Sequence, residues 1–314
     1  MTHFIIRRLL QSVILLIAIT MLSFVLQHLA PGGPGEFAFD PRLPPDYAIK
    51  QRHDLGLDQP LPVQYGSWVW QMAQLNFGRS FTDQRPVSAK ILEKAPNTLL
   101  LSGTGLLIGL LGIPLGILAA LRRDGFYDSS LRVFTVLGSA IPHWWLALVI
   151  LIVSARTLNL FPIAGMYTPG HDSLLNRLHH LLLPAIIGGF SGWLIFSRFM
   201  RSELLEVLTQ DYVRTARAKG LEERVVIYRH ALRNALIVVI TILGGSLAGL
   251  LSGAVLIEYV FSWPGMGRLT YDSALQRDYP TLMALVVITS ALVILGNFLA
   301  DIAYGFVDPR VQYD

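Results

Sequence analysis

Six stretches of 20 or more residues contain no Asp, Glu, Lys or Arg, and they constrain the fold more than any other feature of the chain. These runs cover 9–35, 95–121, 133–155, 178–197, 234–257 and 279–300. A helix needs about 20 apolar residues to cross the hydrocarbon of a bilayer, so each run is long enough to be a membrane span. Only 15% of the 314 residues are charged, against about 25% in soluble domains. The sequence therefore predicts an all-α polytopic membrane protein with six transmembrane helices.

A seventh uncharged run, 59–78, contains two prolines and five amide side chains, so it is too polar for a span. We expect an interfacial helix here, with Trp68 and Trp70 in the headgroup layer, where an amphipathic ring is favoured. The segment before it, opening with APGGPGEFAFDPRLPPDY, is too rich in Pro and Gly for regular structure. The part after it, which ends at AKILEKAP, is helix-prone.

The placement of Lys and Arg predicts the orientation. With six spans, 14 of the 25 basic residues fall on the side of the N-terminus, and seven of the other 11 lie in the long 31–97 segment, where the count is a weaker guide. Both termini should therefore be cytoplasmic. A cleaved signal peptide is the alternative for residues 1–30, but an apolar region of more than twenty residues exceeds the usual length of about 7–15.

Small residues recur at four-residue spacing in several runs. The pairs are Gly105 with Gly109, Gly112 with Gly116 and Gly188 with Gly192, and the fifth run has three in succession, Gly245, Gly249 and Gly253. Such spacing lets helix backbones approach closely. Packing within one subunit is one explanation, and a subunit interface or moving seam is the other; the triple-glycine face is the best candidate for the second.

Several kinds of chemistry are missing from the sequence. No run contains an Asp, Glu, Lys or Arg that could carry a coupling ion, as such groups do in secondary transporters. Glu258 and Asp301 lie just beyond the ends of runs, where we expect solvated or interfacial carboxylates. No Lys follows a Gly and no Cys is present, which excludes a phosphate-binding loop and thiolate chemistry. His171, His179 and His180 are expected to be polar interface residues rather than a metal site, because no carboxylate accompanies them at ligand spacing. No catalytic residue is predicted.

The charged stretch DYVRTARAKGLEERVVIYRHALRNAL, residues 211–236, lies between two apolar runs. We expect two short helices joined at Gly220, which would supply the left-handed residue that ends the first. In the second, Val225, Tyr228 and Leu232 would form one apolar stripe. An amphipathic helix on the lipid surface is the alternative, but a projecting corner suits a socket in a partner protein.

These segments carry a resemblance to a known family. DYVRTARAKG followed by HALRNAL is similar to the cytoplasmic coupling loop of permease subunits of ATP-binding-cassette (ABC) importers in the dipeptide, oligopeptide and nickel family. EYVFSWPGMGRL with LQRDYP resembles that family's last outer loop, and LGLDQPLPVQYGSWVW, RPV and VDPR also match. Against the broader importer consensus, only Ala216, Gly220 and Leu232 of the coupling loop are retained, which is typical of peptide-type members.

The resemblance implies the type I ABC importer transmembrane fold. Its implied parts are an N-terminal helix with an extracytoplasmic segment (1–94), the transmembrane domain (95–305) with a coupling loop at 201–233, and a cytoplasmic tail (306–314). The implied ATPase contacts are Asp211, Tyr212, Arg214, Thr215, Ala216, Arg217, Lys219, Gly220, Leu221, His230 and Leu232. The implied outer gate or docking lip comprises Phe261, Trp263, Pro264, Gly265 and Gly267. Residues 263–266 fit a tight turn with Pro second and Gly third; a purely structural turn is the alternative.

The resemblance also implies partners: a second, homologous permease, two cytoplasmic ATPases, an extracytoplasmic solute-binding protein and membrane lipid, without nucleic acid. The chain itself would be non-catalytic and bind no cofactor or metal, since ATP and Mg²⁺ are used by the ATPases. Short peptides are the first choice of substrate, followed by a nickel chelate and glutathione. Outside the family, the alternatives are a self-sufficient channel or secondary carrier, which the uncharged spans oppose, and a membrane scaffold or receptor.

Overall fold

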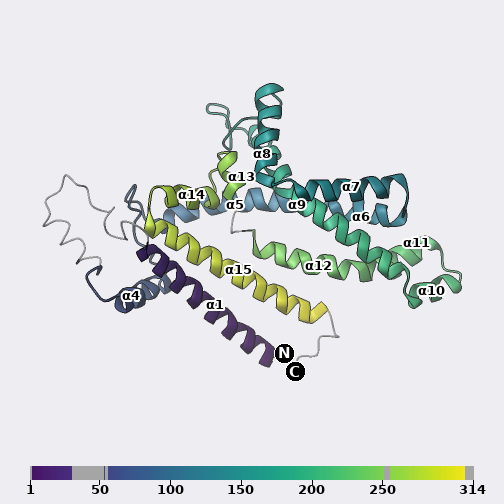
Figure 1. The fold of residues 1–314 in the computed structure, drawn as a ribbon, viewed down its shortest axis with the longest axis horizontal. Coiled ribbons are helices and arrows are strands. Elements are labelled where there is room, and N and C mark those ends of the chain that lie inside the picture. The colour runs from purple at the N-terminus through teal and green to yellow at the C-terminus, as the bar shows by residue number, and fades with distance from the viewer. Residues whose placement is uncertain (1, 30–52, 54–55, 251–254, 308–314) are drawn as a thin grey trace.

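The computed structural model describes residues 2–29, 53, 56–250 and 255–307, and these residues are almost entirely helical (Figure 1). The helices are α1 (Thr2–Leu29), α4 (Leu61–Ala73), α5 (Val87–Leu110), α6 (Gly112–Leu121), α7 (Phe126–Ala140), α8 (His143–Leu151), α9 (Leu174–Leu208), α10 (Asp211–Ala218), α11 (Glu223–Val225), α12 (Leu232–Ala248), α13 (Val255–Val260), α14 (Met266–Leu275) and α15 (Tyr279–Val307). Two π-helical turns, η1 (Ile152–Thr157) and η2 (Val226–Ala231), complete the order. The predicted helical fold class is confirmed.

Five helical segments are long and apolar enough to cross a membrane: 5–29, 87–121, 174–208, 223–246 and 279–299. The third predicted run, 133–155, is not one continuous helix. It falls on α7 and α8, which are bent by 96° relative to each other, and the pair counts as a sixth candidate only when taken together. Pro142 explains the break, because proline forces the residue before it out of the helical region, and Ile141 is extended at φ −90°, ψ 123°.

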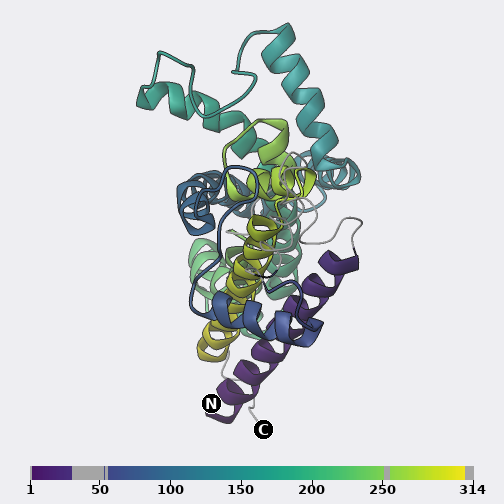
Figure 2. The same ribbon diagram turned by 90° about the vertical axis from the view of Figure 1, so that its left-hand side faces the viewer.

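The longest helix, α9, is the centre of the bundle. It packs against α5, α6, α7, α8 and α12, whereas α1 lies at the edge against α15 and α4. Figure 1 shows α1 beginning and α15 ending toward the end of the bundle that carries α10 and α11, while α4 and α14 lie toward the other end. The view at right angles shows α4 crossing α1 at the periphery (Figure 2). The start of α1 and the end of α15 therefore lie toward the same end of the bundle (Figure 1), as six crossings would require.

A seam of glycines holds α5 and α6 against α9. A Cβ added at Gly112 would overlap the carbonyl of Trp193, and one added at Gly116 would overlap that of Ser197. Gly109 and Gly192 face each other in the same seam, with an added Cβ on Gly109 lying 3.2 Å from the Cα of Gly192. The close approach expected from the glycine spacing is therefore confirmed for α5 and α6 and for Gly192. It is wrong for Gly188, which has no atom within 4 Å of an added Cβ.

The triple-glycine face behaves differently. Gly245 has no atom within 4 Å of an added Cβ, so it is not part of a close helix contact within this chain. Gly249 is exposed, and Gly253 lies outside the described residues. A role for this face in contact with another subunit stays a prediction.

Candidate functional site

The corner at residues 211–223, within the predicted coupling loop, is built around Gly220. Its φ of +76° is left-handed, a conformation that costs glycine little. The amide of Gly220 donates to the carbonyl of Arg217 at 2.9 Å, and the amide of Leu221 donates to that of Ala216 at 3.4 Å. These two bonds form the Schellman motif that closes a helix, so the predicted end of α10 at this glycine is confirmed.

One face of α10 is locked into the protein and the other is open. Val213 and Ala216 are buried in a cluster that includes Met200 and Leu204 of α9 and Val226 of η2. Full burial of a valine side chain stabilises the folded state by roughly 1.5 to 3 kcal/mol, so this face holds the corner firmly. Ala216 thus packs inward, although it was among the expected ATPase contacts.

The open face carries the charges. The side chains of Asp211 and Arg214 are 96% and 70% exposed, and Thr215 and Lys219 are exposed beside them. No other part of the described chain covers this face. Leu221 is 42% exposed at the tip of the corner.

The second helix of the corner differs from the prediction. It does not end near Arg233 but continues from Glu223 through η2 into α12, so that it is the start of a span. The expected stripe of Val225, Tyr228 and Leu232 is also wrong, because Tyr228 is 55% exposed. The buried positions are instead Val226, Ala231, Ala235 and Val239. The π-helical turn shifts the register by one residue, and a 3.6-residue period cannot anticipate this shift.

Two further contacts make the corner rigid. Arg217 binds both carboxylate oxygens of Glu223, at 3.1 and 2.7 Å, and so bridges the two sides of Gly220. The amide of Asn234 in α12 donates to the hydroxyl of Tyr212 at 2.7 Å. His230 is half-buried and Leu232 packs against the cluster under α10. Among the expected contact residues, Tyr212, Arg217, His230 and Leu232 therefore also position the corner.

A buried ion pair near the same end was not foreseen from the sequence. Asp128 at the start of α7 is fully buried and binds Arg201 of α9 through both carboxylate oxygens, with Arg201 Nη2 to Asp128 Oδ2 at 2.7 Å. It also accepts the amide of Asp124 at 3.0 Å. The pair joins the start of α7, just after the loop that follows α6, to the central helix. It could not be predicted from local sequence patterns, because 73 residues separate the two side chains.

The outer loop is organised by Glu258, which we expected to be solvated or interfacial. That expectation is wrong: Glu258 is fully buried. Its carboxylate accepts the hydroxyl of Thr98 in α5 and the backbone amide of Arg268 in α14, both at 2.9 Å. The amide of Gly267 is a third donor. Burial raises the pKa of the Glu258 carboxyl, against these three hydrogen bonds, and α14 begins at the carboxylate, where its dipole favours negative charge.

This carboxylate explains the glycines of the WPGMG motif. A Cβ on Gly265 would lie 2.6 Å from Glu258 Oε1, and a Cβ on Gly267 would lie 2.8 Å from the Cα of Val255. Glycine is needed at both positions because the loop closes directly around Glu258. The predicted four-residue turn at 263–266 is wrong, since Gly265 is extended at φ −104°, ψ −175° and the Met266 amide donates to Thr98 Oγ1 at 2.7 Å. The chain instead makes a three-residue turn, in which the amide of Gly265 donates to the carbonyl of Trp263 at 2.9 Å.

Phe261 and Trp263 are buried, at 3% and 1% exposure, and not presented at the outer surface. The indole of Trp263 donates to the carbonyl of Asn97 at 2.9 Å, and the amide of Asn97 donates to the carbonyl of Pro264 at 2.8 Å. These bonds anchor the outer loop to α5. We name the set Asn97, Thr98, Glu258, Trp263 and Gly265 the outer lock.

A second buried network joins residues 80–90, which flank the segment RPV, to Asp278 of the segment LQRDYP. Asp278, which is 1% exposed, accepts the hydroxyls of Ser80 and Thr281, each at 2.6 Å, and the amide of Phe81 at 2.9 Å. The ammonium of Lys90 lies 3.5 Å from Asp278 and 2.9 Å from the Ser80 hydroxyl. The start of α5 and the start of α15 are therefore tied together at the outer end.

Two of the three histidines that the metal alternative would use, His179 and His180, bond to other groups of the protein. His180 contacts the hydroxyl of Thr168 at 3.1 Å and the carbonyl of Gly165 at 3.0 Å, and His179 contacts the carbonyl of Leu160 at 2.8 Å. In the described part of the chain, no three His, Asp or Glu side chains lie together as metal ligands.

Comparison with known proteins decides the family. The model for the binding-protein-dependent transport system inner membrane component matches residues 112–313, and the model for its N-terminal part matches residues 1–102. The chain belongs to this family. Members are the transmembrane permeases of ABC importers, so this permease is the membrane component, and ATP hydrolysis belongs to separate subunits.

Named relatives align over the whole permease. It is 42% identical over 316 residues to the oligopeptide transport system permease protein AppB of Bacillus subtilis, covering 100% of both chains. It is 41% identical to a putative peptide permease protein of Brucella suis, covering 99% of both. It is 38% identical to the di/tripeptide transport system permease protein DppB of Pseudomonas aeruginosa, covering 100% of this chain and 99% of that one.

The fold is that of a type I ABC importer. A chain of the inward-facing MetNI methionine ABC transporter superposes with a TM-score of 0.55 at 16% identity, and the match covers 71% of this permease and 99% of that chain. A second crystal form of the same transporter gives the same TM-score at 17% identity. The predicted transmembrane fold is confirmed.

At mid-depth, the permease has a cavity of about 260 Å³ beside the glycine seam. Its lining comes from α5, α9 and the end of α12, and includes Ser102, Gly188, Ser246 and Gly249. None of the lining residues is ionisable. Glycine leaves the helix backbone uncovered, so the polar groups available at this wall are two hydroxyls and main-chain groups.

Proposed function

We propose that this permease forms half of the translocation pathway for short peptides that a solute-binding protein delivers from outside the cell. In this proposal, a second homologous permease supplies the other half, and two cytoplasmic ATPases drive the cycle. The α10 corner lies in a cleft of one ATPase.

The packing of the corner against α9 and the start of α12 is the observation that carries the proposal. The corner joins the end of α9 to the start of α12, and its inner face is buried against both. Its outer face, by contrast, is charged and uncovered in the described chain. A force on the open face is therefore passed to two spans at once. Such a device can change the state of the bundle only if the ATPase contacts it differently before and after ATP binding.

The names of the relatives support peptides as the substrate. All the relatives described above are named as permeases for peptides, oligopeptides or di/tripeptides. The uncharged lining of the mid-depth cavity is compatible with a peptide main chain of any sequence, because it offers hydroxyls and backbone groups but no charge. Nickel chelate and glutathione remain the alternatives that a transport assay separates.

Gly220→Pro tests the coupling. Proline cannot adopt φ +76°, and it lacks the amide that donates to Arg217, so the Schellman motif cannot form. We expect uptake of a labelled dipeptide to fall by at least about tenfold, since the lost hydrogen bond and the forced change of backbone conformation each cost on the order of 1 to 3 kcal/mol locally. The assay uses cells that express the variant with the intact partner proteins.

Gly170→Pro is the matched control. Gly170 is also left-handed, at φ +84°, with open space around an added Cβ, but it lies in the loop before α9. Uptake should stay near the wild-type level in this variant. Normal uptake by a well-expressed Gly220→Pro variant would refute the coupling role. A different outcome would be uptake of a nickel chelate or of glutathione instead of the dipeptide, with the same loss of uptake in Gly220→Pro. It would refute the proposal that peptides are the substrate but would support the coupling role of the corner.

A further inference from the structure

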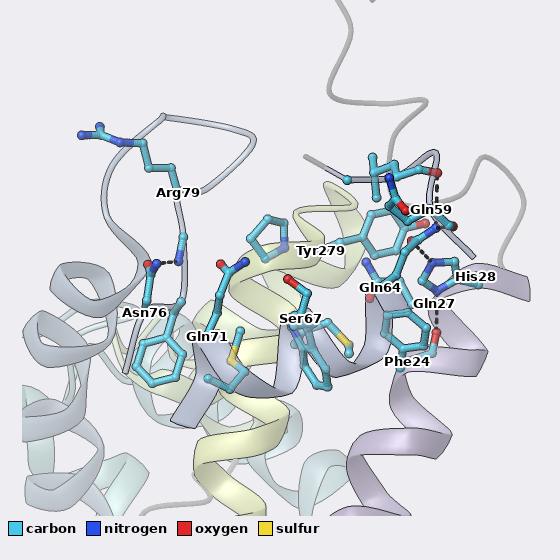
Figure 3. Close-up of a pocket in the computed structure, with 18 of the residues that line it drawn as sticks. Phe24, Gln27, His28, Gln59, Gln64, Ser67, Gln71, Asn76, Arg79 and Tyr279 are labelled. Carbon is cyan, nitrogen blue, oxygen red and sulfur yellow. Dashed lines mark hydrogen bonds between the residues drawn. The ribbon is translucent and has the colours of Figure 1, made fainter. Parts of the chain in front are cut away.

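A cavity of about 450 Å³ lies at the other end of the molecule, between α1, α4 and the start of α15 (Figure 3). It is separate from the mid-depth cavity and shares no lining residue with it. The volume is within the range of small-molecule sites, about 300 to 1,000 Å³. Nothing in the proposed transport cycle uses this site.

The lining is apolar on one side and polar on the other. Phe24, Trp68, Met72, Phe77 and Met283 form the apolar part. Figure 3 shows Ser67 and Gln71 projecting from α4 to the opposite side, with Asn76 beside them. A ligand that fits both parts must itself be amphipathic.

Several polar side chains of the lining have no hydrogen-bond partner in the described part of the chain, among them the amides of Gln27 and Gln71 and the hydroxyl of Ser67. By contrast, Gln64 and His28 are bonded to each other at 3.3 Å, and His28 also bonds to the carbonyl of Phe24 at 2.8 Å. The structure therefore offers neutral donors that are free to bind a ligand.

Charge is nearly absent from the site. No lining residue is an acid, and the single Arg, Arg79, directs its guanidinium away from the cavity and donates to the carbonyl of Gln84 at 2.8 Å (Figure 3). A free amino acid or short peptide carries a charged amine and carboxylate. Both groups lose solvation in such a site without a charged partner, which is costly. The lining is therefore poorly matched to the proposed substrate.

The position of the cavity identifies a membrane amphiphile. The cavity lies where two candidate spans, 5–29 and 279–299, reach the outer end of the bundle, and only 11% of the apolar window of the first span is buried. Below it, the surface of α1 is apolar and open at Met21, Leu22 and Leu26, all more than half exposed. Trp70 of α4 is 66% exposed beside it, as suits an interfacial indole.

We propose that this cavity binds one phospholipid of the outer leaflet. The glycerol and ester oxygens accept hydrogen bonds from Gln27, Ser67 and Gln71, and the acyl chains lie along the open face of α1. Since no ionised group faces the cavity, the site recognises the shared backbone of phospholipids and not the headgroup charge. The bound lipid fills the space between α1, α4 and α15 and fixes the angle at which α1 leaves the bundle.

Native mass spectrometry of the assembled importer, titrated with phosphatidylethanolamine or phosphatidylglycerol, tests the proposal. We expect one phospholipid to remain bound under conditions that strip the others, with affinities for the two lipids that agree within about threefold. Gln71→Leu removes one donor and should weaken this lipid by about fivefold, and Ser67→Trp should exclude it by filling the cavity. Gln74→Leu is the control. Gln74 directly follows α4 and is exposed, but it does not line the cavity.

A second measurement applies even if the variants assemble poorly. Trp68 lies in the wall of the cavity, so a phospholipid brominated near the top of its acyl chains should quench a component of emission that Trp68→Phe lacks. Unchanged lipid affinity in both Gln71→Leu and Ser67→Trp, or equal quenching of wild type and Trp68→Phe, would overturn the proposal. Displacement of the retained lipid by a dipeptide would also overturn it and would make the cavity a peptide site.

Discussion

Gly265→Ala should break the outer lock by adding a single methyl group. The new Cβ would lie 2.5 Å from Glu258 Cδ and 2.6 Å from Oε1, far inside van der Waals contact. The carboxylate must then move away from Thr98 Oγ1 and the amide of Arg268, to each of which it is now bonded at 2.9 Å. Each buried group left unsatisfied costs about 1 to 3 kcal/mol, so the variant should lose about 2 to 4 kcal/mol of stability.

A double-mutant cycle with Glu258→Ala isolates this effect. Truncating Glu258 removes the atoms that the methyl group strikes, so Gly265→Ala should cost about 2 kcal/mol less in that background, a coupling typical of residues in contact. Thermal unfolding of the detergent-purified importer, followed by loss of assembled complex, gives the comparison. Gly103→Ala is the control, because no atom lies within 4 Å of an added Cβ there. Additive costs, within about 0.5 kcal/mol, would refute the overlap on which the reasoning depends.

Two further predictions concern the inner end. Arg201→Ala leaves the buried carboxylate of Asp128 without its guanidinium partner and should destabilise the assembled complex by about 3 to 5 kcal/mol. Arg132→Ala is the control and should have little effect, because Arg132 is 50% exposed and 3.8 Å from Asp128. Equal melting temperatures for the two variants would contradict this prediction. The chain has no cysteine, so a single engineered cysteine can report the side of the membrane on which its position lies. A membrane-impermeant thiol reagent applied to spheroplasts should label a cysteine at position 79 and not one at position 219. Labelling at position 219 from outside would disprove the six-span orientation.

The sequence predicted the features that depend on local rules. The length of the charge-free runs was enough to identify the candidate spans, because a charged side chain in hydrocarbon is costly whichever helix carries it. Glycine spacing found the α5–α6 contact with α9, and the left-handed residue at Gly220 followed from the end of a helical pattern. Each of these is set within one segment of about 20 residues.

The failures all depend on contacts between distant segments. Glu258 follows an apolar run and resembles an interfacial acid, and only Thr98 and the start of α14 make its burial tolerable. The pairing of Asp128 with Arg201 was overlooked for the same reason, because 73 residues separate them. Pro142 is the exception, since its effect on Ile141 is local; counting charges alone overlooked it.

The glycine seam has a mechanical consequence. Where helix backbones are in direct contact, as in the glycine seam, relative movement of the helices would force backbone atoms to overlap. We therefore expect α5, α6 and the inner part of α9 to move together as one stiff beam, with the corner at its end. From Ala185 to Leu208 this beam is about 36 Å long at 1.5 Å per residue. A sideways displacement of the tip by one helical pitch, 5.4 Å, tilts a beam of that length by about 9° and moves its midpoint by about 2.7 Å. On α9, the mid-depth cavity is lined by Gly188, Gly189, Gly192 and Phe196, which lie between the inner end of this beam and its midpoint. Under the proposed coupling, a shift of one pitch at the corner would therefore move the cavity wall by about 0.7 to 2.5 Å.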